Sequence, residues 1–131
     1  MNAVAQTILV VDDDPAIRKV ATRVLELHGY TVLTVATGEA AMDLIAERET
    51  PVDLILTDIV MPGMNGHELA TWLGAEHPQI RVLFTSGLPE EAVVHRGALD
   101  AGTPFIEKPY AITDLVHRVR EVLDAAPRAQ A

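Results

Sequence analysis

Aspartates lie at the ends of two apolar segments that are far apart in the chain. Residues 12–14 are all aspartate and directly follow the apolar run 8–11, and Asp58 ends the run 54–58. Two later apolar runs lead to side chains that could act with these acids, Thr85 and Lys108. In an open parallel sheet, ligands bind outside the carboxyl ends of the strands, so these positions are candidates for one site.

Carboxylates that meet in one site repel each other. Two like charges about 4 Å apart near a protein surface cost about 4 kcal/mol, so either one acid stays protonated or a cation neutralises them. The candidate donor atoms are all oxygen, and no His or Cys lies at ligand spacing. This donor set favours Mg²⁺.

A carboxylate beside a divalent metal, an ammonium and a hydroxyl suits phosphoryl transfer to an aspartate. The carboxylate would be the nucleophile, and the cations would neutralise charge on the transferring group. The product would be an aspartyl phosphate, an acid anhydride that water hydrolyses. Such a short-lived group suits a timed signal.

Length and composition limit the class of protein. The 131 residues predict a single domain with one core, about 7–124, followed by a short flexible tail at 125–131. Apolar residues make up 49% and aromatic residues only 4%, which is typical of a buried parallel sheet covered by helices. The net charge of −9 argues against a nucleic-acid-binding surface.

Several other classes are disfavoured. The chain has no cysteine, so neither a disulfide framework nor thiol chemistry is expected. Its first residues do not form a signal peptide, and no run approaches the roughly 20 apolar residues of a membrane span. We therefore expect a cytoplasmic protein that does not insert into membranes.

The elements that would position the candidate residues alternate along the chain. Strand-like runs are expected at about 7–11, 31–35, 53–57, 80–85 and 104–107. Amphipathic helices are expected between and after them, at about 15–28, 38–48, from 65 onward, at 89–100 and at 112–124. This alternation predicts right-handed βαβ units in a flavodoxin-like (βα)5 fold, a doubly wound five-stranded parallel sheet of order 2-1-3-4-5 with helices on both faces.

Capping residues support the helix boundaries. Asp14 is expected to cap the first helix, Thr37 the second, and Asn65 with Glu68 the third through a capping box. The apolar stripe of the first helix comprises Ile17, Val20, Ala21, Val24 and Leu25, and that of the last helix comprises Ile112, Leu115, Val116, Val119 and Leu123.

Four segments in order resemble the receiver domain of bacterial two-component response regulators. They are ILVVDDDPAIR, DLILTDIVMPGMNG, VLFTSG and FIEKP, and the resemblance covers residues 7 to about 124. It implies a phosphorelay switch, not a turnover enzyme, that takes a phosphoryl group from a sensor histidine kinase or a histidine phosphotransfer protein. The segment GLPEEAVVHRGALDAGTPFIEKPY also resembles receivers of hybrid sensor kinases.

The resemblance implies a role for each candidate site residue. Asp58 would be the phosphoacceptor. Asp13 and Asp58, with the backbone carbonyl of Val60, would bind Mg²⁺, and Asp12 would support the ion through water. Thr85 would hydrogen-bond one phosphoryl oxygen, and Lys108 would pair with another.

The resemblance also implies a conformational switch. Thr85 would move toward the phosphate, Phe105 would follow into the vacated space, and the face formed by helix 4, strand 5 and helix 5 would change. The Lys108–Pro109 peptide bond would be cis.

Three positions depart from the family pattern. Val60 and Gly87 stand where side chains tune hydrolysis, and neither can hold an attacking water, so the sequence does not predict the lifetime of the phosphorylated state. Ala111 stands where receivers often carry a Ser or Thr cap for the last helix.

Two other functions fit part of the sequence. The Asp12–Asp14 segment contains the D-x-D of haloacid dehalogenase-type phosphatases, although Ala16 replaces the hydroxyl residue expected there. In that case Asp12 and not Asp58 would carry the phosphate. The other alternative is a receiver-like binding module that signals without phosphate; it would lack an acid or the lysine, and here none is missing.

Overall fold

The computed structural model describes residues 5–47, 51–60, 63–87, 89 and 103–125. Five parallel strands form one sheet in the order β2-β1-β3-β4-β5. The strands are β1 (Thr7–Val11), β2 (Thr31–Val35), β3 (Leu54–Asp58), β4 (Arg81–Ser86) and β5 (Phe105–Glu107). The predicted fold class and strand order are confirmed.

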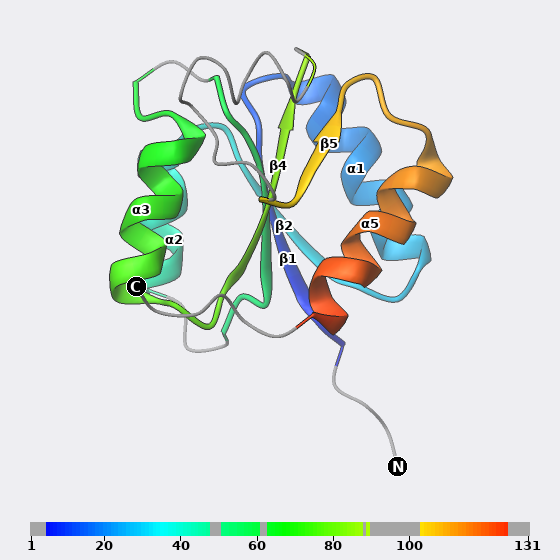
Figure 1. Cartoon of the computed structure of the whole chain (residues 1–131). Coiled ribbons are helices and arrows are strands. Elements are labelled where there is room, and N and C mark those ends of the chain that lie inside the picture. The colour runs from blue at the N-terminus through cyan, green and yellow to red at the C-terminus, as the bar shows by residue number, and fades with distance from the viewer. Residues whose placement is uncertain (1–4, 48–50, 61–62, 88, 90–102, 126–131) are drawn as a thin grey trace.

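Helices cover both faces of the sheet. Figure 1 shows the sheet nearly edge-on, with α2 (Gly38–Glu47) and α3 (Gly66–Glu76) on its left and α1 (Pro15–Leu27) and α5 (Ile112–Asp124) on its right. The predicted helix at 89–100 lies almost entirely outside the described residues. None of the helices that the structure describes is both long and apolar enough to cross a membrane.

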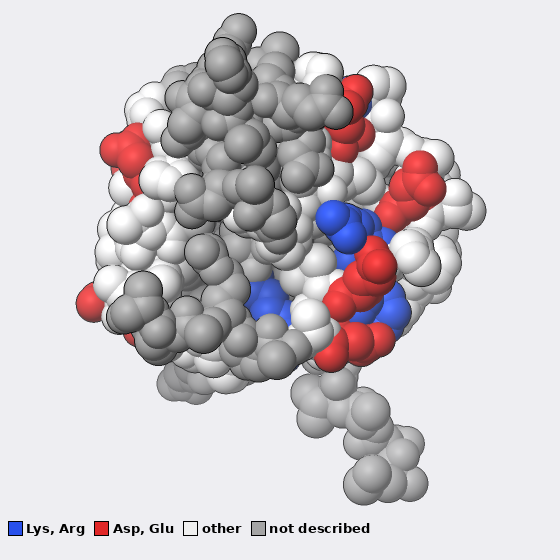
Figure 2. All heavy atoms as spheres, viewed as in Figure 1, with Lys and Arg blue, Asp and Glu red and all other residues white. Residues whose placement is uncertain are grey.

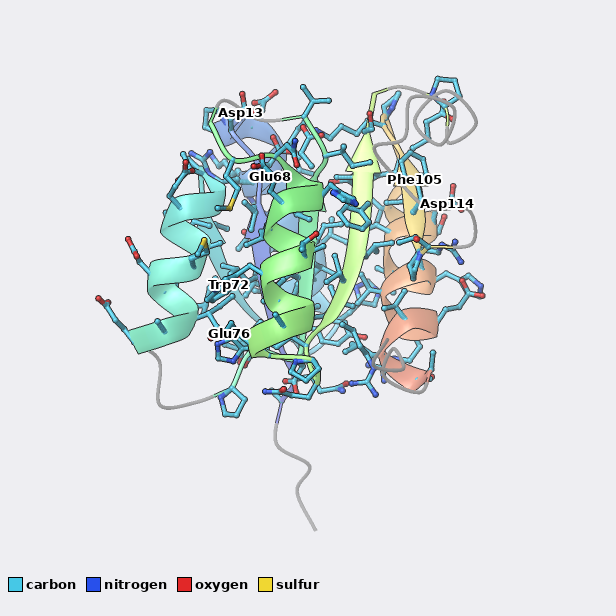
Figure 3. All side chains as sticks on the ribbon, turned by 60° about the vertical axis from the view of Figure 1, so that its left-hand side comes forward. Asp13, Glu68, Trp72, Glu76, Phe105 and Asp114 are labelled. Atoms are coloured by element: carbon cyan, nitrogen blue, oxygen red, sulfur yellow. The ribbon has the colours of Figure 1, made fainter. Side chains whose placement is uncertain are left out.

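The core has two halves, one on each side of the sheet. Alternate residues of a strand point to opposite faces, so Leu9 and Ile55 pack toward α2 and α3, whereas Ile8 and Leu56 pack toward α1 and α5. Trp72 lies on α3 on the side nearer α2 and is only partly buried (Figure 3). The sheet is therefore buried on both faces, as its apolar composition predicts.

Three strands begin one residue later than predicted, namely β3, β4 and β5. Asp53, just before β3, still bonds to both neighbouring strands: its N–H donates to the Thr7 carbonyl and its carbonyl accepts from Arg81 N. The Asp53 side chain also accepts from Thr7 N at 2.8 Å. Asp53 is thus a structural residue at the opposite end of the strands from Asp58.

The predicted caps are confirmed. The Asp14 side chain accepts a backbone N–H in the first turn of α1, and that of Thr37 does the same for α2. Asn65 and Glu68 form the reciprocal capping box of α3, with distances of 2.8 and 3.0 Å. Helix α5 starts after Ala111 with no side-chain cap.

Two predicted core positions are wrong. Val20 in α1 is 52% exposed and Ile112 in α5 is 56% exposed. Both lie at a rim of the apolar stripe, beyond the width of helix surface that the sheet covers. Ile112 is also the first residue of α5, where no preceding turn packs over it.

Candidate active site at the carboxyl ends of the strands

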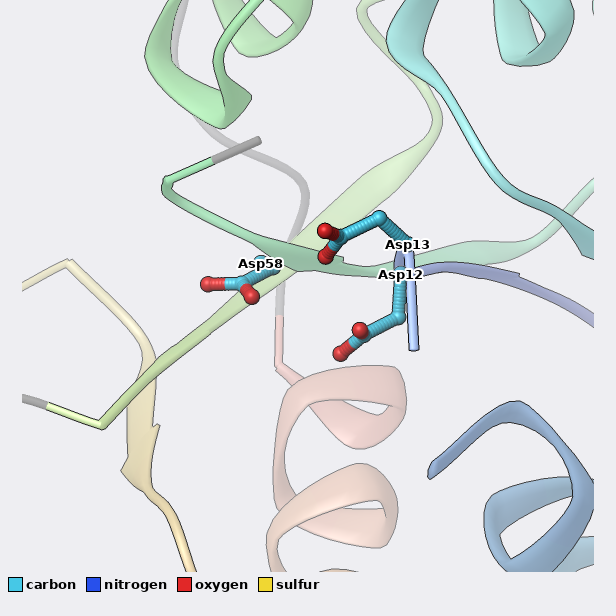
Figure 4. A group of neighbouring side chains, drawn as sticks. All are labelled: Asp12, Asp13 and Asp58. Atoms are coloured by element: carbon cyan, nitrogen blue, oxygen red, sulfur yellow. The ribbon is translucent and has the colours of Figure 1, made fainter. Parts of the chain in front are cut away.

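Three carboxylates meet where β1 and β3 end. The strands pair in parallel register, with Val11 opposite Thr57, so the residues that follow them emerge side by side. Oxygens of Asp12, Asp13 and Asp58 lie within 4.8 Å of one another (Figure 4). Asp12 and Asp58 are buried and Asp13 is exposed, so the cluster is open to solvent on the side of Asp13.

Lys108 joins two of these acids. Its ammonium lies 2.8 Å from Oδ2 of Asp12 and 2.8 Å from Oδ2 of Asp58. The Lys108 backbone is fixed next to β4, because its N–H donates to the Ser86 carbonyl at 2.8 Å. The predicted cis bond between Lys108 and Pro109 is present.

The environment opposes ionisation of Asp58. Burial raises its pKa, and this effect exceeds the opposing hydrogen bond from Lys108. Burial is the largest single effect on the pKa of Lys108 and would lower it, but the hydrogen bonds and the charge attraction of Asp12 and Asp58 together raise it. The ammonium therefore stays charged, and one positive charge faces three carboxylates.

This donor set fits a hard divalent cation. One ammonium leaves excess negative charge, and carboxylate oxygens are the preferred ligands of Mg²⁺. The Asp13 carboxylate has no hydrogen bond to any residue that the structure describes, which leaves its oxygens free for a cation. The backbone N–H of Val60 donates to Oδ1 of Asp58 at 3.3 Å; a role for the Val60 carbonyl stays a prediction.

Thr85 lies opposite Asp58 in the β3–β4 register. Its side-chain oxygen is buried and has no hydrogen-bond partner among the described residues. A buried polar group without a partner costs about 1–3 kcal/mol. A phosphoryl oxygen on Asp58 would be a partner of the right chemistry for this hydroxyl.

Phe105 is buried in the core half that faces α2 and α3. Its register partner on β4 is Phe84, whereas Ile106 is opposite Thr85. Thr85 and Phe105 therefore lie on adjacent strands but are not register partners. In the Figure 3 view, Phe105 lies on β5, on the other side of α3 from Trp72.

Three residues support the site although the sequence analysis did not single them out. A Cβ on Gly66 would lie 2.4 Å from the Asp58 carbonyl oxygen, so only glycine fits there. Glu39 accepts from the backbone N–H of Met64, and Arg18 donates to the Asp12 carbonyl at 2.7 Å. The Asn-Gly pair at the start of α3 indicates a tight turn, so the need for glycine at position 66 could have been predicted. Glu39 and Arg18 are charged residues within helices, and no local pattern indicates their contacts with the site.

Most of the chain matches one known protein family. Residues 8–120 match the model of the response regulator receiver domain. The chain belongs to this family. Receiver domains are regulatory modules of two-component signalling, and the predicted relationship is therefore confirmed.

Individual relatives support this assignment. The chain is 33% identical to the response regulator receiver protein CpdR of Brucella abortus over 119 residues, which cover 91% of this chain and 98% of CpdR. It is 36% identical to a stretch of the sensor kinase CckA of the same organism, covering 90% of this chain but 12% of the kinase. The chain also spans about half of the DNA-binding response regulator MtrA of Mycolicibacterium smegmatis, at 36% identity.

Solved structures agree with the fold. A CheY-like receiver domain protein from Methanospirillum hungatei has a TM-score of 0.78 at 31% identity, covering 92% of this chain and 95% of that one. A putative response regulator from Chloroflexus aurantiacus has a TM-score of 0.80 at 26% identity, covering 93% and 100%. The alternative of a haloacid dehalogenase-type phosphatase disagrees with this family assignment.

Proposed function

We propose that this receiver, with its core at about 7–124, is a cytoplasmic phosphoacceptor switch that carries its phosphoryl group on Asp58. The observation that supports this most strongly is the cluster of Asp12, Asp13 and Asp58 with a single ammonium between two of them. Asp58 lies at the end of β3, the strand between β1, which leads into the two other acids, and β4, which carries the Thr85 hydroxyl.

Asp13 and Asp58, with the Val60 carbonyl, would hold Mg²⁺, and Asp12 would support it through water. When bound, the ion neutralises charge on the carboxylates and on the transferring phosphoryl group. The chain's own residues do the rest: the end of β3 orients the largely buried Asp58, and Lys108 supplies a positive charge next to it.

The transfer forms one bond and breaks another. A lone pair of an Asp58 carboxylate oxygen forms an O–P bond to the phosphohistidine of the donor protein. The P–N bond breaks, its electron pair stays on the imidazole nitrogen, and that nitrogen takes a proton. Lys108 moves from the Asp58 carboxylate toward a phosphoryl oxygen, and Thr85 donates to another.

The phosphohistidine donor, a kinase or phosphotransfer protein, has a docking place beside Lys108. An apolar groove of about 580 Å³ runs between α1 and the segment before α5, lined by Ile17, Val20, Pro109 and Tyr110 with Lys108 at one side. The exposed Val20 belongs to this groove, which gives its apolar side chain a reason to face solvent. An apolar contact here would hold the donor next to Asp58.

The switch would act by shifting an equilibrium. Phe105 is buried in this structure. We propose that a phosphoryl group, by engaging Thr85, favours this buried state over states with Phe105 outside, and thereby alters the surface of helix 4, β5 and α5. The shift cannot exceed the phosphoryl group's preference for one state over the other.

The experiment is labelling with a small acyl phosphate donor in the presence of Mg²⁺, followed by intact mass. The wild-type chain should gain one phosphoryl group, Asp58→Asn should gain none, and Asp13→Asn should be slowed. Asp43→Asn is the matched control, because Asp43 is an exposed acid on α2 outside the cluster. Labelling of Asp58→Asn at the wild-type rate would show that the phosphoacceptor is wrongly assigned.

A further inference from the structure

Strand β2 is the edge of the sheet, and half of its backbone faces outward. The Thr31 N–H donates to the Gln6 carbonyl, and the Val35 carbonyl accepts from the Asp12 N–H. The backbone groups of Thr31 and Val35 therefore point toward β1. Because N–H and C=O groups alternate in direction along a strand, Val32 and Thr34 present theirs to the open side. In the described part of the chain, β2 pairs only with β1.

This edge lacks the usual protection against strand addition. Natural edge strands carry charged residues, prolines or bulges that prevent another chain from pairing. The β2 sequence is TVLTV, with neither a charge nor a proline, and it pairs with β1 in register over all five residues. Its β-branched residues favour an extended partner.

A cationic groove lies directly beside the edge. It has a volume of about 500 Å³ and is formed by α1 and by Thr34 of β2, with Arg18, Lys19 and Arg23 among its lining residues. The Thr34 side chain therefore lies on the same side of the strand as these three cations. The groove is on the flank of α1 away from the apolar groove beside Lys108.

None of these three cations forms an ion pair within the described part of the chain, although one acid, Glu26, also lines the groove. By contrast, Arg118 and Arg120 of α5 form ion pairs, and acidic and basic side chains alternate on that helix (Figure 2). Arg18 uses one N–H for the Asp12 carbonyl and keeps its other donors. Lys19 and Arg23 are four residues apart on one helix, a like-charge spacing that destabilises the helix slightly.

We propose that the outer edge of β2 and the cationic groove form a docking site for an extended acidic segment of a partner protein. Backbone pairing to Val32 and Thr34 would supply direction and register. Carboxylates of the partner on the same side as Thr34 would reach Arg18, Lys19 and Arg23. This local group of three cations contrasts with the net charge of −9 of the whole chain. This site goes beyond the proposed phosphoacceptor function and does not depend on it.

The geometry also predicts the pattern of the segment. Side chains of an added strand alternate between the two faces of the sheet. On the α1 face they would meet the cations, and on the other face they would lie beside Leu33 and Val35, which pack toward α2. The matching segment therefore alternates acidic residues with β-branched apolar ones.

The test uses a short peptide of alternating valine and glutamate as the probe, with a valine–lysine peptide as its control. Hydrogen exchange of the full chain is measured by NMR with each peptide. The outward amides of Val32 and Thr34 should exchange at least about tenfold more slowly with the glutamate peptide, and the effect should weaken with salt. No protection, or equal protection by both peptides, would overturn the proposal.

Matched variants separate edge pairing from charge. Thr34→Pro removes an outward N–H, which an edge strand tolerates, and should abolish binding, whereas Thr34→Ala should retain it. Arg23→Gln should weaken binding about tenfold and Arg118→Gln, with the same change in charge, should not. If Thr34→Pro binds like Thr34→Ala, or if pyrophosphate competes and the Val32 amide is unprotected, the groove is an anion site and the docking proposal is wrong.

Discussion

The Lys108 ammonium lies 2.8 Å from a carboxylate oxygen of Asp58, at the point where β3 ends. The same ammonium lies 2.8 Å from a carboxylate oxygen of Asp12, so it bridges acids that follow or end two neighbouring strands. The groups that we propose for phosphoryl transfer therefore already lie together, with more negative charge than one lysine can balance.

The first prediction concerns the cost of burying Asp58. We expect Asp58→Asn to stabilise the metal-free chain at neutral pH by about 1 kcal/mol, because burial opposes the ionised form. A raised folded-state pKa means that this group favours folding below its ordinary value of 3.8 and loses that contribution as pH rises through the folded-state pKa. The advantage of Asn should therefore shrink on acidification.

Thermal unfolding in a chelator, across pH, measures this effect. Asp43→Asn, an exposed substitution, serves as the control and should change little. A loss of stability in Asp58→Asn at neutral pH would show that the pairing with Lys108 outweighs burial.

The second prediction concerns Lys108. Lys108→Ala leaves Asp12 and Asp58 facing each other with no cation, and we expect the metal-free chain to lose about 3 kcal/mol of stability while keeping its fold. Magnesium should recover part of the loss. Lys19→Ala removes an exposed lysine without an ion pair among the described residues and should cost less than about 0.5 kcal/mol.

Phosphorylation of the Lys108→Ala chain should no longer change the environment of Phe105, which a fluorinated phenylalanine reports by NMR. Wild-type stability without metal, or a normal Phe105 response, would contradict the role given to Lys108.

The third prediction concerns the buried hydroxyl of Thr85. Thr85→Val keeps the shape and removes a polar group without a described partner, so the unphosphorylated chain should gain about 1–3 kcal/mol. The phosphorylated chain should lose the benefit of the hydrogen bond. Thr85→Ser keeps the hydroxyl and should retain the response. The measurement is the melting temperature of each variant with and without acyl phosphate and Mg²⁺, and equal shifts in both variants would argue against contact with the phosphoryl group.

The fourth prediction concerns the donor groove. Val20→Asp places a charge in the apolar groove and should slow transfer from a phosphohistidine protein at least about tenfold, because it removes an apolar contact. Labelling by a small acyl phosphate should be unchanged. Leu27→Asp is the control, because Leu27 is an exposed apolar residue at the other end of the same helix. Equal effects of both substitutions would place the donor elsewhere.

The fifth prediction concerns the start of α5. The backbone at Ala111 is extended, as an N-cap requires, but its side chain cannot accept a hydrogen bond. Ala111→Ser should therefore stabilise the chain by about 1 kcal/mol, measured by urea unfolding. The reverse change at a working cap, Asn65→Ala in α3, should destabilise it by a similar amount.

The sequence predicted the strand order and the meeting of Asp12, Asp13 and Asp58 because both follow from local patterns. Alternating elements imply parallel pairing, and parallel pairing brings strand ends together. Caps such as Asp14 were equally local, since a cap depends on the next few residues only.

Other features depend on long-range packing that no local pattern encodes. The exposure of Val20 depends on how much of the α1 surface the sheet covers, and the spacing of apolar residues in the sequence does not predict this. The bridge from Lys108 to Asp12 joins residues 96 positions apart, and its exact partners depend on side-chain geometry. The open edge of β2 and the cations of α1 are brought together only by folding, which places Thr34 beside Arg18, Lys19 and Arg23.

The most direct test of the account is to find which carboxylate carries the phosphoryl group. Borohydride reduces an acyl phosphate to an alcohol, so the labelled chain can be reduced, digested and mapped by mass spectrometry. We predict homoserine at position 58 alone, and only when magnesium was present during labelling. Reduction at Asp12 or Asp13, or labelling of Asp58 that a chelator leaves unchanged, would contradict the account.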